Sequence, residues 1–260
     1  MKQTFDEHEL PLKDLQKLGM ADGKILRIWP DDLNALLGGR RTDLLKFHDL
    51  HADGFKIDEI QARLSLERGE DGKVSLKIHP IYKTAQQHPL LTDTQSEALL
   101  KGQSSIVTKD KEGKVLVVEY DPETKTFIDY DPEKITVPEK VNNETLKEGQ
   151  KRDFRLGNIV ELSDGTRFQH RANEKKGVVS DRKALVLSVL LDGGISYLLL
   201  RGLKNLTGSK DLQKEAYTSG YNQALKEMNE WKDQIQKEQQ DVSQQNNAQQ
   251  SRGYGRGLAR

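Results

Sequence analysis

A short unit that occurs twice constrains the fold of this sequence more than any other feature. The first copy runs from Leu91 to Gly102 and the second from Leu146 to Gly157. At a constant offset the copies match at four positions, which pair Leu91 with Leu146, Gln95 with Gln150, Leu99 with Phe154, and Gly102 with Gly157. We interpret this as a tandem repeat; the alternative is chance similarity between two amphipathic helices.

Each copy predicts a short helix that leads into a β-hairpin. The matched apolar positions lie on one helical face, and the glycine stands where a left-handed residue commonly ends a helix. Apolar runs flank a polar turn at 111–113 after the first copy and at 163–165 after the second. A helix with one hairpin cannot bury its apolar surface alone, so we expect the copies to pack together or on neighbours.

The first part of the chain predicts a separate module of short helices and strands. Helices are expected at 11–18 and 30–37, each followed by glycine, with a short strand at 24–28 between them. Residues 57–66 and 74–78 alternate between apolar and polar side chains around Asp71-Gly72, which predicts an antiparallel hairpin. Residues 79–90 contain two prolines and are interpreted as a linker.

The most apolar stretch runs from Ala184 to Leu206. We expect a buried helical hairpin broken at 192–194, with paired strands as an alternative. A membrane span is disfavoured because Asp192 and two glycines divide the stretch into pieces shorter than the roughly 20 residues that a span needs.

The last part of the chain is polar. Residues 212–237 predict a helix with a sparse apolar stripe, and the Gln/Asn-rich segment 239–250 and the Arg/Gly-rich end are expected to be disordered. The predicted class is therefore α+β, with modules at 1–80, 81–143, 144–208 and 209–260.

Composition limits the function classes. Lys+Arg and Asp+Glu are both 41, so net charge does not favour nucleic acid, membrane or an acidic partner. The absence of cysteine excludes disulfides, thiolate catalysis and Cys-ligated metal. Together with a start that lacks the apolar core of a signal peptide, it predicts a cytoplasmic protein.

The sequence contains no motif that predicts catalysis. A nucleophile elbow, a P-loop and a dinucleotide fingerprint are all absent, so we predict no catalytic residue, no cofactor and no small-molecule substrate. His48 and His51 could share a helix face, with Asp53 as the nearest third ligand, but two histidines at this spacing do not predict a metal site. Acidic residues 121–133 surround two Asp-Pro turns and are interpreted as turn formers.

Two groups of residues are weak candidates for nucleic-acid contact. The C-terminal group can pair with phosphates and stack on bases, and consists of Arg252, Tyr254, Arg256 and Arg260. The second group is Arg40 and Arg41, for which the alternative is neutralisation of a helix C-terminus.

Several segments resemble an uncharacterised family. Residues 11–19, 36–45, 62–66 and 79–82 resemble an N-terminal domain of unknown function in proteins of Bacteroidota conjugative transposons and other mobile elements. Residues 160–168 and 191–197 are similar to a companion domain that often occurs in tandem. The resemblance covers about residues 5–208, implies an accessory protein of a mobile element, and supplies no catalytic residues.

We therefore expect a non-enzymatic binding or scaffold protein, with a protein partner and a nucleic-acid partner equally open. The first alternative is a metal-dependent nuclease or hydrolase that uses scattered Asp, Glu and His. The second is a protein that associates with membranes through residues 184–206.

Overall fold

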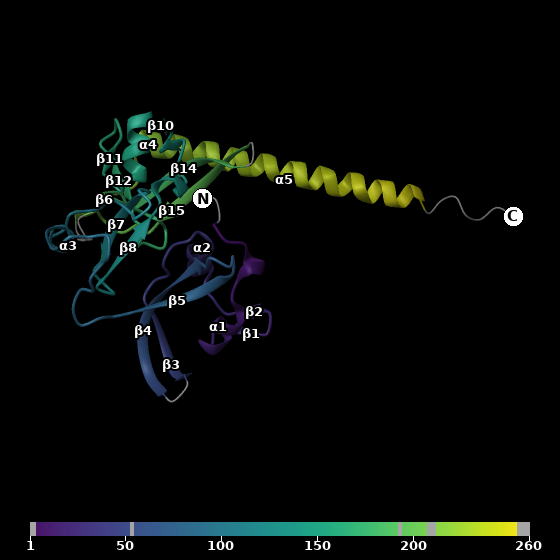
Figure 1. Cartoon of the computed structure of the whole chain (residues 1–260). Helices are drawn as coiled ribbons and strands as arrows, with labels where there is room; N and C mark the ends of the chain where they lie inside the picture. Colours follow the sequence, from purple (N-terminus) through teal and green to yellow (C-terminus); the bar gives the residue numbers. More distant parts are fainter. Residues whose placement is uncertain (1–3, 53–54, 192–193, 207–211, 254–260) are drawn as a thin grey trace.

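The computed structural model describes residues 4–52, 55–191, 194–206 and 212–253, and from Asp241 onward it describes the backbone alone. Helices and antiparallel sheets are mixed along this part of the chain, which confirms the α+β class. The N-terminal module lies below the rest of the protein in Figure 1, and helix α5 projects from the upper part.

The N-terminal module packs two short helices on a three-stranded sheet. The sheet has the order β3-β4-β5, and α1 and α2 supply the residues that cover it. The predicted helices and the hairpin at Asp71-Gly72 are confirmed. The elements are η1 (Glu7–Glu9), α1 (Leu12–Lys17), β1 (Ala21–Asp22), β2 (Ile25–Leu26), α2 (Pro30–Leu37), β3 (Leu45–Ala52), β4 (Phe55–Arg68) and β5 (Val74–Pro80).

The tandem repeat is confirmed. The third strand of the first copy agrees with the apolar return at 127–130, whereas the third strand of the second copy, at 178–180, was not predicted. We call Leu91–Tyr130 repeat 1 and Leu146–Ser180 repeat 2; each is a helix followed by a three-stranded antiparallel sheet. Repeat 1 contains α3 (Asp93–Leu100), β6 (Ile106–Lys109), β7 (Val115–Asp121) and β8 (Thr126–Tyr130). After η2 (Pro132–Lys134), β9 (Lys140–Val141) and β10 (Glu144–Thr145), repeat 2 contains α4 (Glu148–Arg155), β11 (Val160–Glu161), β12 (Arg167–His170) and β13 (Val178–Ser180).

The matched residues have the same local roles in both copies. The side-chain oxygens of Gln95 and Gln150 each accept a 2.9 Å hydrogen bond from the backbone N–H three residues earlier. Gly102 and Gly157 have φ of 104° and 68° directly after the helix. The repeated letters therefore encode a helix start and a helix stop.

The expected helical hairpin at 184–206 is wrong, and the alternative of paired strands is confirmed. β14 (Ala184–Leu191) and β15 (Gly194–Arg201) form an antiparallel pair in a sheet of order β10-β9-β14-β15. One face of β14 packs on the repeat 2 core through Leu185 and Leu187, and the other packs under α5 through Ala184 and Val186. A strand buried on both faces is apolar on both, and β14 has Ser188 as its one polar residue, so it lacks the alternation that identifies a strand.

Helix α5 (Ser219–Gly253) starts later and ends later than the sequence predicts. Segment 239–250, expected to be disordered, is helical; it is rich in Gln, a good helix former, and no proline or glycine interrupts it. Residues 254–260 lie outside the described residues. Within the described part, no helix is long and apolar enough to cross a membrane.

Candidate functional site

The loop from Arg171 to Gly177, which we call the junction loop, contacts both the N-terminal module and repeat 1. On the repeat 1 side, Arg171 donates to the carbonyl of Ser104 at 2.6 Å, and the Ala172 N–H donates to the carboxylate of Glu119 at 2.9 Å. The loop therefore links the two repeats, together with the hydrogen bond from the Ser105 hydroxyl to the carbonyl of Leu156 at 2.8 Å.

The same loop continues into the N-terminal module. The carbonyl of Asn173 accepts a hydrogen bond from Arg63, and the carbonyl of Lys175 accepts one from Arg40 at 2.9 Å. The Lys175 ammonium lies 2.6 Å from the carboxylate of Asp43. Because these contacts come from closely spaced residues of one loop, they hold the module and the repeats in one arrangement.

A buried ionic cluster joins the N-terminal module to repeat 1 beside this loop. Arg41 donates to Asp121 at 3.0 Å, and Arg63 lies 3.6 Å from the same carboxylate. The three side chains are 7%, 0% and 1% exposed for Arg41, Asp121 and Arg63. Charges removed from water are costly unless each finds a partner, so this cluster is tolerated only while the two parts stay docked.

A second buried polar group lies between the repeats and is formed by Glu119, Tyr130 and His170. Burial raises the pKa of Glu119 to about 7, opposed by the charge of Arg171, whose guanidinium lies 3.9 Å away. Burial, with a smaller contribution from the charge of Arg40, lowers the pKa of His170 to about 3. The repeats therefore meet around an imidazole that stays neutral and a carboxyl group that titrates near neutral pH.

Next to the junction loop, an open cleft of about 500 Å³ separates α2 from the edge of β15. One wall comes from α2 and the residues after it, the second from Lys175 and Lys176, and the third from Leu198 to Arg201. The lining contains four cationic side chains, Arg40, Lys175, Lys176 and Arg201, against one carboxylate, Asp31. Burial lowers the pKa of Arg40 to about 10, which leaves it cationic at neutral pH. The cleft is therefore suited to an anionic group.

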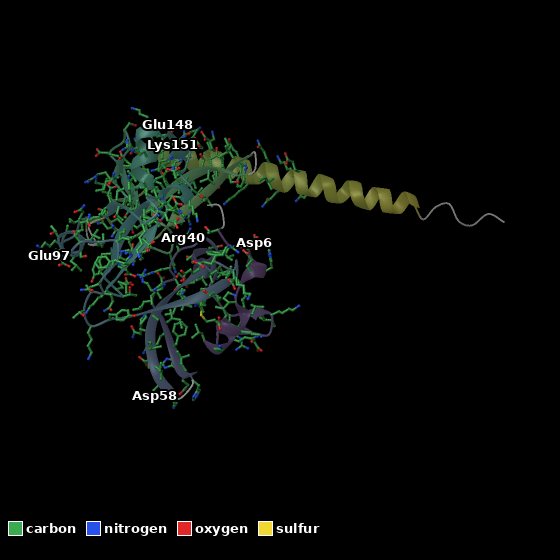
Figure 2. The ribbon with its side chains drawn as sticks, viewed as in Figure 1. Asp6, Arg40, Asp58, Glu97, Glu148 and Lys151 are labelled. Atoms are coloured by element: carbon green, nitrogen blue, oxygen red, sulfur yellow. The ribbon has the colours of Figure 1, made fainter. Side chains whose placement is uncertain are left out.

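The structure separates the two arginines that the sequence places together. Arg40 lines the cleft where the N-terminal module meets the rest of the protein (Figure 2). It also donates to the carbonyl of Asn34 in the last turn of α2 at 3.2 Å, as the helix-end alternative predicts. Arg41 is buried and donates to Asp121, Thr124 and Thr126, and its contact with nucleic acid stays a prediction.

The remaining sequence candidates do not join this site. Arg252 lies at the end of α5, where only the backbone is described, and Tyr254, Arg256 and Arg260 lie outside the described residues. His48 and His51 lie on strand β3, so the shared helix face is wrong; Asp53 also lies outside the described residues. Across the described ranges, no three His, Cys, Asp or Glu side chains form a group that could hold a metal ion.

The junction loop and the cleft were not predicted from the sequence. Their residues come from α2, β4, β7, β12 and β15, and nothing in local spacing indicates that these elements meet. A usable signal was present in Arg63, a charged residue between apolar neighbours Ala62 and Leu64 in a strand of alternating pattern. A charged residue at such a position either faces solvent or pairs with an opposite charge inside the protein. Arg63 is 1% exposed and is therefore of the second kind.

Fold and site together define an α+β protein whose modules are joined by buried charge pairs beside a cationic cleft. Residues 5–90 match the model of a family described as protein of unknown function (DUF4099). The N-terminal module and the linker that follows it are thus similar to an uncharacterised domain family. No curated protein and no solved structure matches this chain.

Proposed function

We propose that this chain is a non-enzymatic binding or scaffold protein that acts beside the DNA-processing machinery of a mobile genetic element. The mobile-element context rests on the resemblance to domains of Bacteroidota conjugative transposons. We place the protein in the cytoplasm on the same basis, together with the absence of cysteine.

The observation that carries the binding role is the cleft at the junction of the modules. Buried charge pairs on one side hold its walls in position, and a pre-formed site loses less entropy on binding than a mobile one. The charged side chains at the junction are paired with one another and with the backbone of the junction loop. This arrangement suits a role in holding the modules together.

We favour a protein partner over nucleic acid at this cleft. Arg41 is paired with Asp121 inside the protein. One wall of the cleft is the edge of a sheet, and such an edge pairs readily with another backbone. Nucleic-acid contact through the C-terminal group of Arg252, Tyr254, Arg256 and Arg260 is the competing arrangement.

A salt series separates the two arrangements. Binding of the purified full chain to single- and double-stranded DNA and RNA is measured beside a truncation after Lys237. We expect weak binding that disappears at physiological salt and that the truncation abolishes. Tight binding that survives removal of the tail and responds steeply to salt would instead place nucleic acid on the folded body.

A turnover assay tests the non-enzymatic role. The full chain is incubated with nucleic acids and nucleotides, with and without Mg²⁺, Mn²⁺ or Zn²⁺. We expect no product. Metal-dependent turnover that is abolished by changing one carboxylate would overturn the proposal and favour the nuclease or hydrolase alternative.

A further inference from the structure

We propose that the cleft binds an extended acidic peptide, which adds as a strand to the free edge of β15. This inference deepens the proposed binding function and rests on it. It combines three features of the cleft, namely the direction of the β15 backbone groups, the charge of the lining and the leucine side chains along the β15 wall.

The hydrogen bonds of β14 show which β15 groups face outward. The backbone N–H groups of Asn142 and Glu139 donate to the carbonyls of Val186 and Ser188, so these two β14 residues point toward β9. Backbone direction alternates along a strand, so Leu185 and Leu187 point toward β15, where they are opposite Leu200 and Leu198. Tyr197, Leu199 and Arg201 must therefore present their backbone groups to the outside of the sheet.

A contact in the structure agrees with this assignment. The Lys176 ammonium donates to the backbone carbonyl of Arg201, which is possible only if that carbonyl points away from β14. Among the described residues, the outward groups of Tyr197 and Leu199 have no backbone partner, and β15 is the last strand of its sheet. The cleft follows this edge from Leu198 to Arg201.

The charge of the lining selects the ligand. Lys175 is partly neutralised by Asp43 at 2.6 Å and Asp32 at 3.9 Å, but neither Lys176 nor Arg201 has a carboxylate partner in the described part of the chain. Lys176 and Arg201 meet at one end of this edge, so acidic side chains of a strand added beside Tyr197 and Leu199 can reach their charges there. Main-chain hydrogen bonds supply affinity and the cations supply specificity, as in other modes of strand addition.

The peptide is favoured over a free phosphate or a nucleic acid. A phosphate would use the cations but not the outward backbone groups of Tyr197 and Leu199. Leu198, Leu199 and Leu200 lie along the same wall and offer apolar contact to alternate side chains of a bound strand. The inferred ligand therefore alternates acidic and apolar residues.

Selection from a displayed library of random peptides against the purified full chain tests the inference. We expect enrichment of peptides that alternate acidic and apolar residues. The variant Lys176→Glu with Arg201→Glu should weaken binding of a synthetic selected peptide by at least about tenfold, because each reversed charge replaces an attraction by a repulsion. The control Lys109→Glu with Lys111→Glu changes net charge equally at the end of β6 and in the turn after it, and should leave binding unchanged.

A second measurement does not depend on folding of the variants. N-methylation of alternate backbone amides of the selected peptide should abolish binding in one register and preserve it in the other, because only one set of amides faces β15. The inference is overturned if selected peptides are no more acidic than the library, if nothing is enriched, or if the double variant binds them equally well. It is also overturned if single-stranded DNA occupies the cleft and no peptide does.

Affinity capture with the same double variant distinguishes the two proposals. If the wild-type chain and the double variant both recover proteins of the element while selection yields no acidic peptide, only the cleft inference fails. Loss of the proposed function itself would appear as enzymatic turnover in the assay above.

Discussion

The two repeats have the same order of helix and strands but bury different kinds of side chain. Repeat 1 closes a small apolar cluster of four buried side chains, Leu99, Ile106, Val118 and Phe127. Repeat 2 contributes to a cluster of ten, which it shares with β9, β14 and the segment after β15. Repeat 1 also buries two carboxylates completely, those of Glu119 and Asp121, and both bind residues of other modules.

This difference shows how one supersecondary unit serves two purposes. Repeat 2 is stabilised mainly by apolar burial, which is non-directional. Repeat 1 depends on directional contacts with the junction loop and the N-terminal module, which fix its orientation.

Removing the carboxylate at the centre of the ionic cluster should have the largest effect. Asp121→Ala leaves Arg41 and Arg63 buried with a lost partner, so we expect a loss of about 3–5 kcal/mol in the free energy of unfolding. Urea denaturation measures this loss. The control Asp58→Ala removes an exposed pair with Lys56 and should change stability by less than about 0.5 kcal/mol. Equal effects in the two variants would show that the cluster does not hold the modules together.

Glu119 should make stability depend on pH. Its pKa is raised in the folded protein from 4.5 to about 7, so between these values the folded state keeps a proton that the unfolded state has lost. Stability contributed by the protonated form is therefore lost as pH rises from about 4.5 to 7, by about 3 kcal/mol in total.

The variant Glu119→Gln cannot ionise and should lack this component. Denaturation of both proteins at pH 5 and pH 8 measures it, since the difference in stability between variant and wild type should move in favour of the variant as pH rises. If the difference in stability between variant and wild type is the same at pH 5 and pH 8, Glu119 is ionised at both. The charge of Arg171 would then outweigh the effect of burial.

The glycine that ends α4 should tolerate substitution less well than the one that ends α1. Gly157 and Gly19 have φ of 68° and 71°, so alanine is similarly strained at both. A Cβ at Gly157 would also lie 3.0 Å from the Tyr130 hydroxyl and 3.2 Å from the Glu119 carboxylate, whereas nothing lies within 4 Å at Gly19.

We expect Gly19→Ala to cost about 1–2 kcal/mol and Gly157→Ala to cost clearly more. Thermal unfolding of the two variants compares these costs. Equal costs would show that the Tyr130 hydroxyl and the Glu119 carboxylate move aside without loss of stability. The close approach of these groups would then not be the reason for glycine at position 157.

The matched glutamines should show the smallest effects and a small asymmetry. Gln95→Ala removes the bond to the Thr92 N–H, for which we expect a loss of about 0.5–1 kcal/mol. Gln150→Ala should cost more, because Gln150 also donates to the carbonyl of Glu161 at 2.9 Å and so ties α4 to β11. Chemical denaturation compares the two variants; a larger loss for Gln95→Ala would contradict this account of the repeats.

Local features of the chain were predictable from the sequence. The glutamines, glycines and Asp-Gly turns act within a few residues of themselves, so the helices of both repeats and the hairpins after them were found in the right places. The strands at 184–201 were not distinguished from helices, because burial on both faces removed the alternation that separates the two. The helix beyond residue 238 was missed because composition, rather than helix propensity, decided that prediction.

The α+β class, the duplicated unit and the absence of cysteine chemistry follow from the amino-acid sequence alone. The docking of the modules places Arg41 inside the protein while Arg40 lines a cleft, although the two are adjacent in the chain. Contacts such as Arg41 with Asp121 and Arg63 with Asn173 join residues far apart in sequence. Their formation depends on how whole modules dock, and local spacing carries no information about docking.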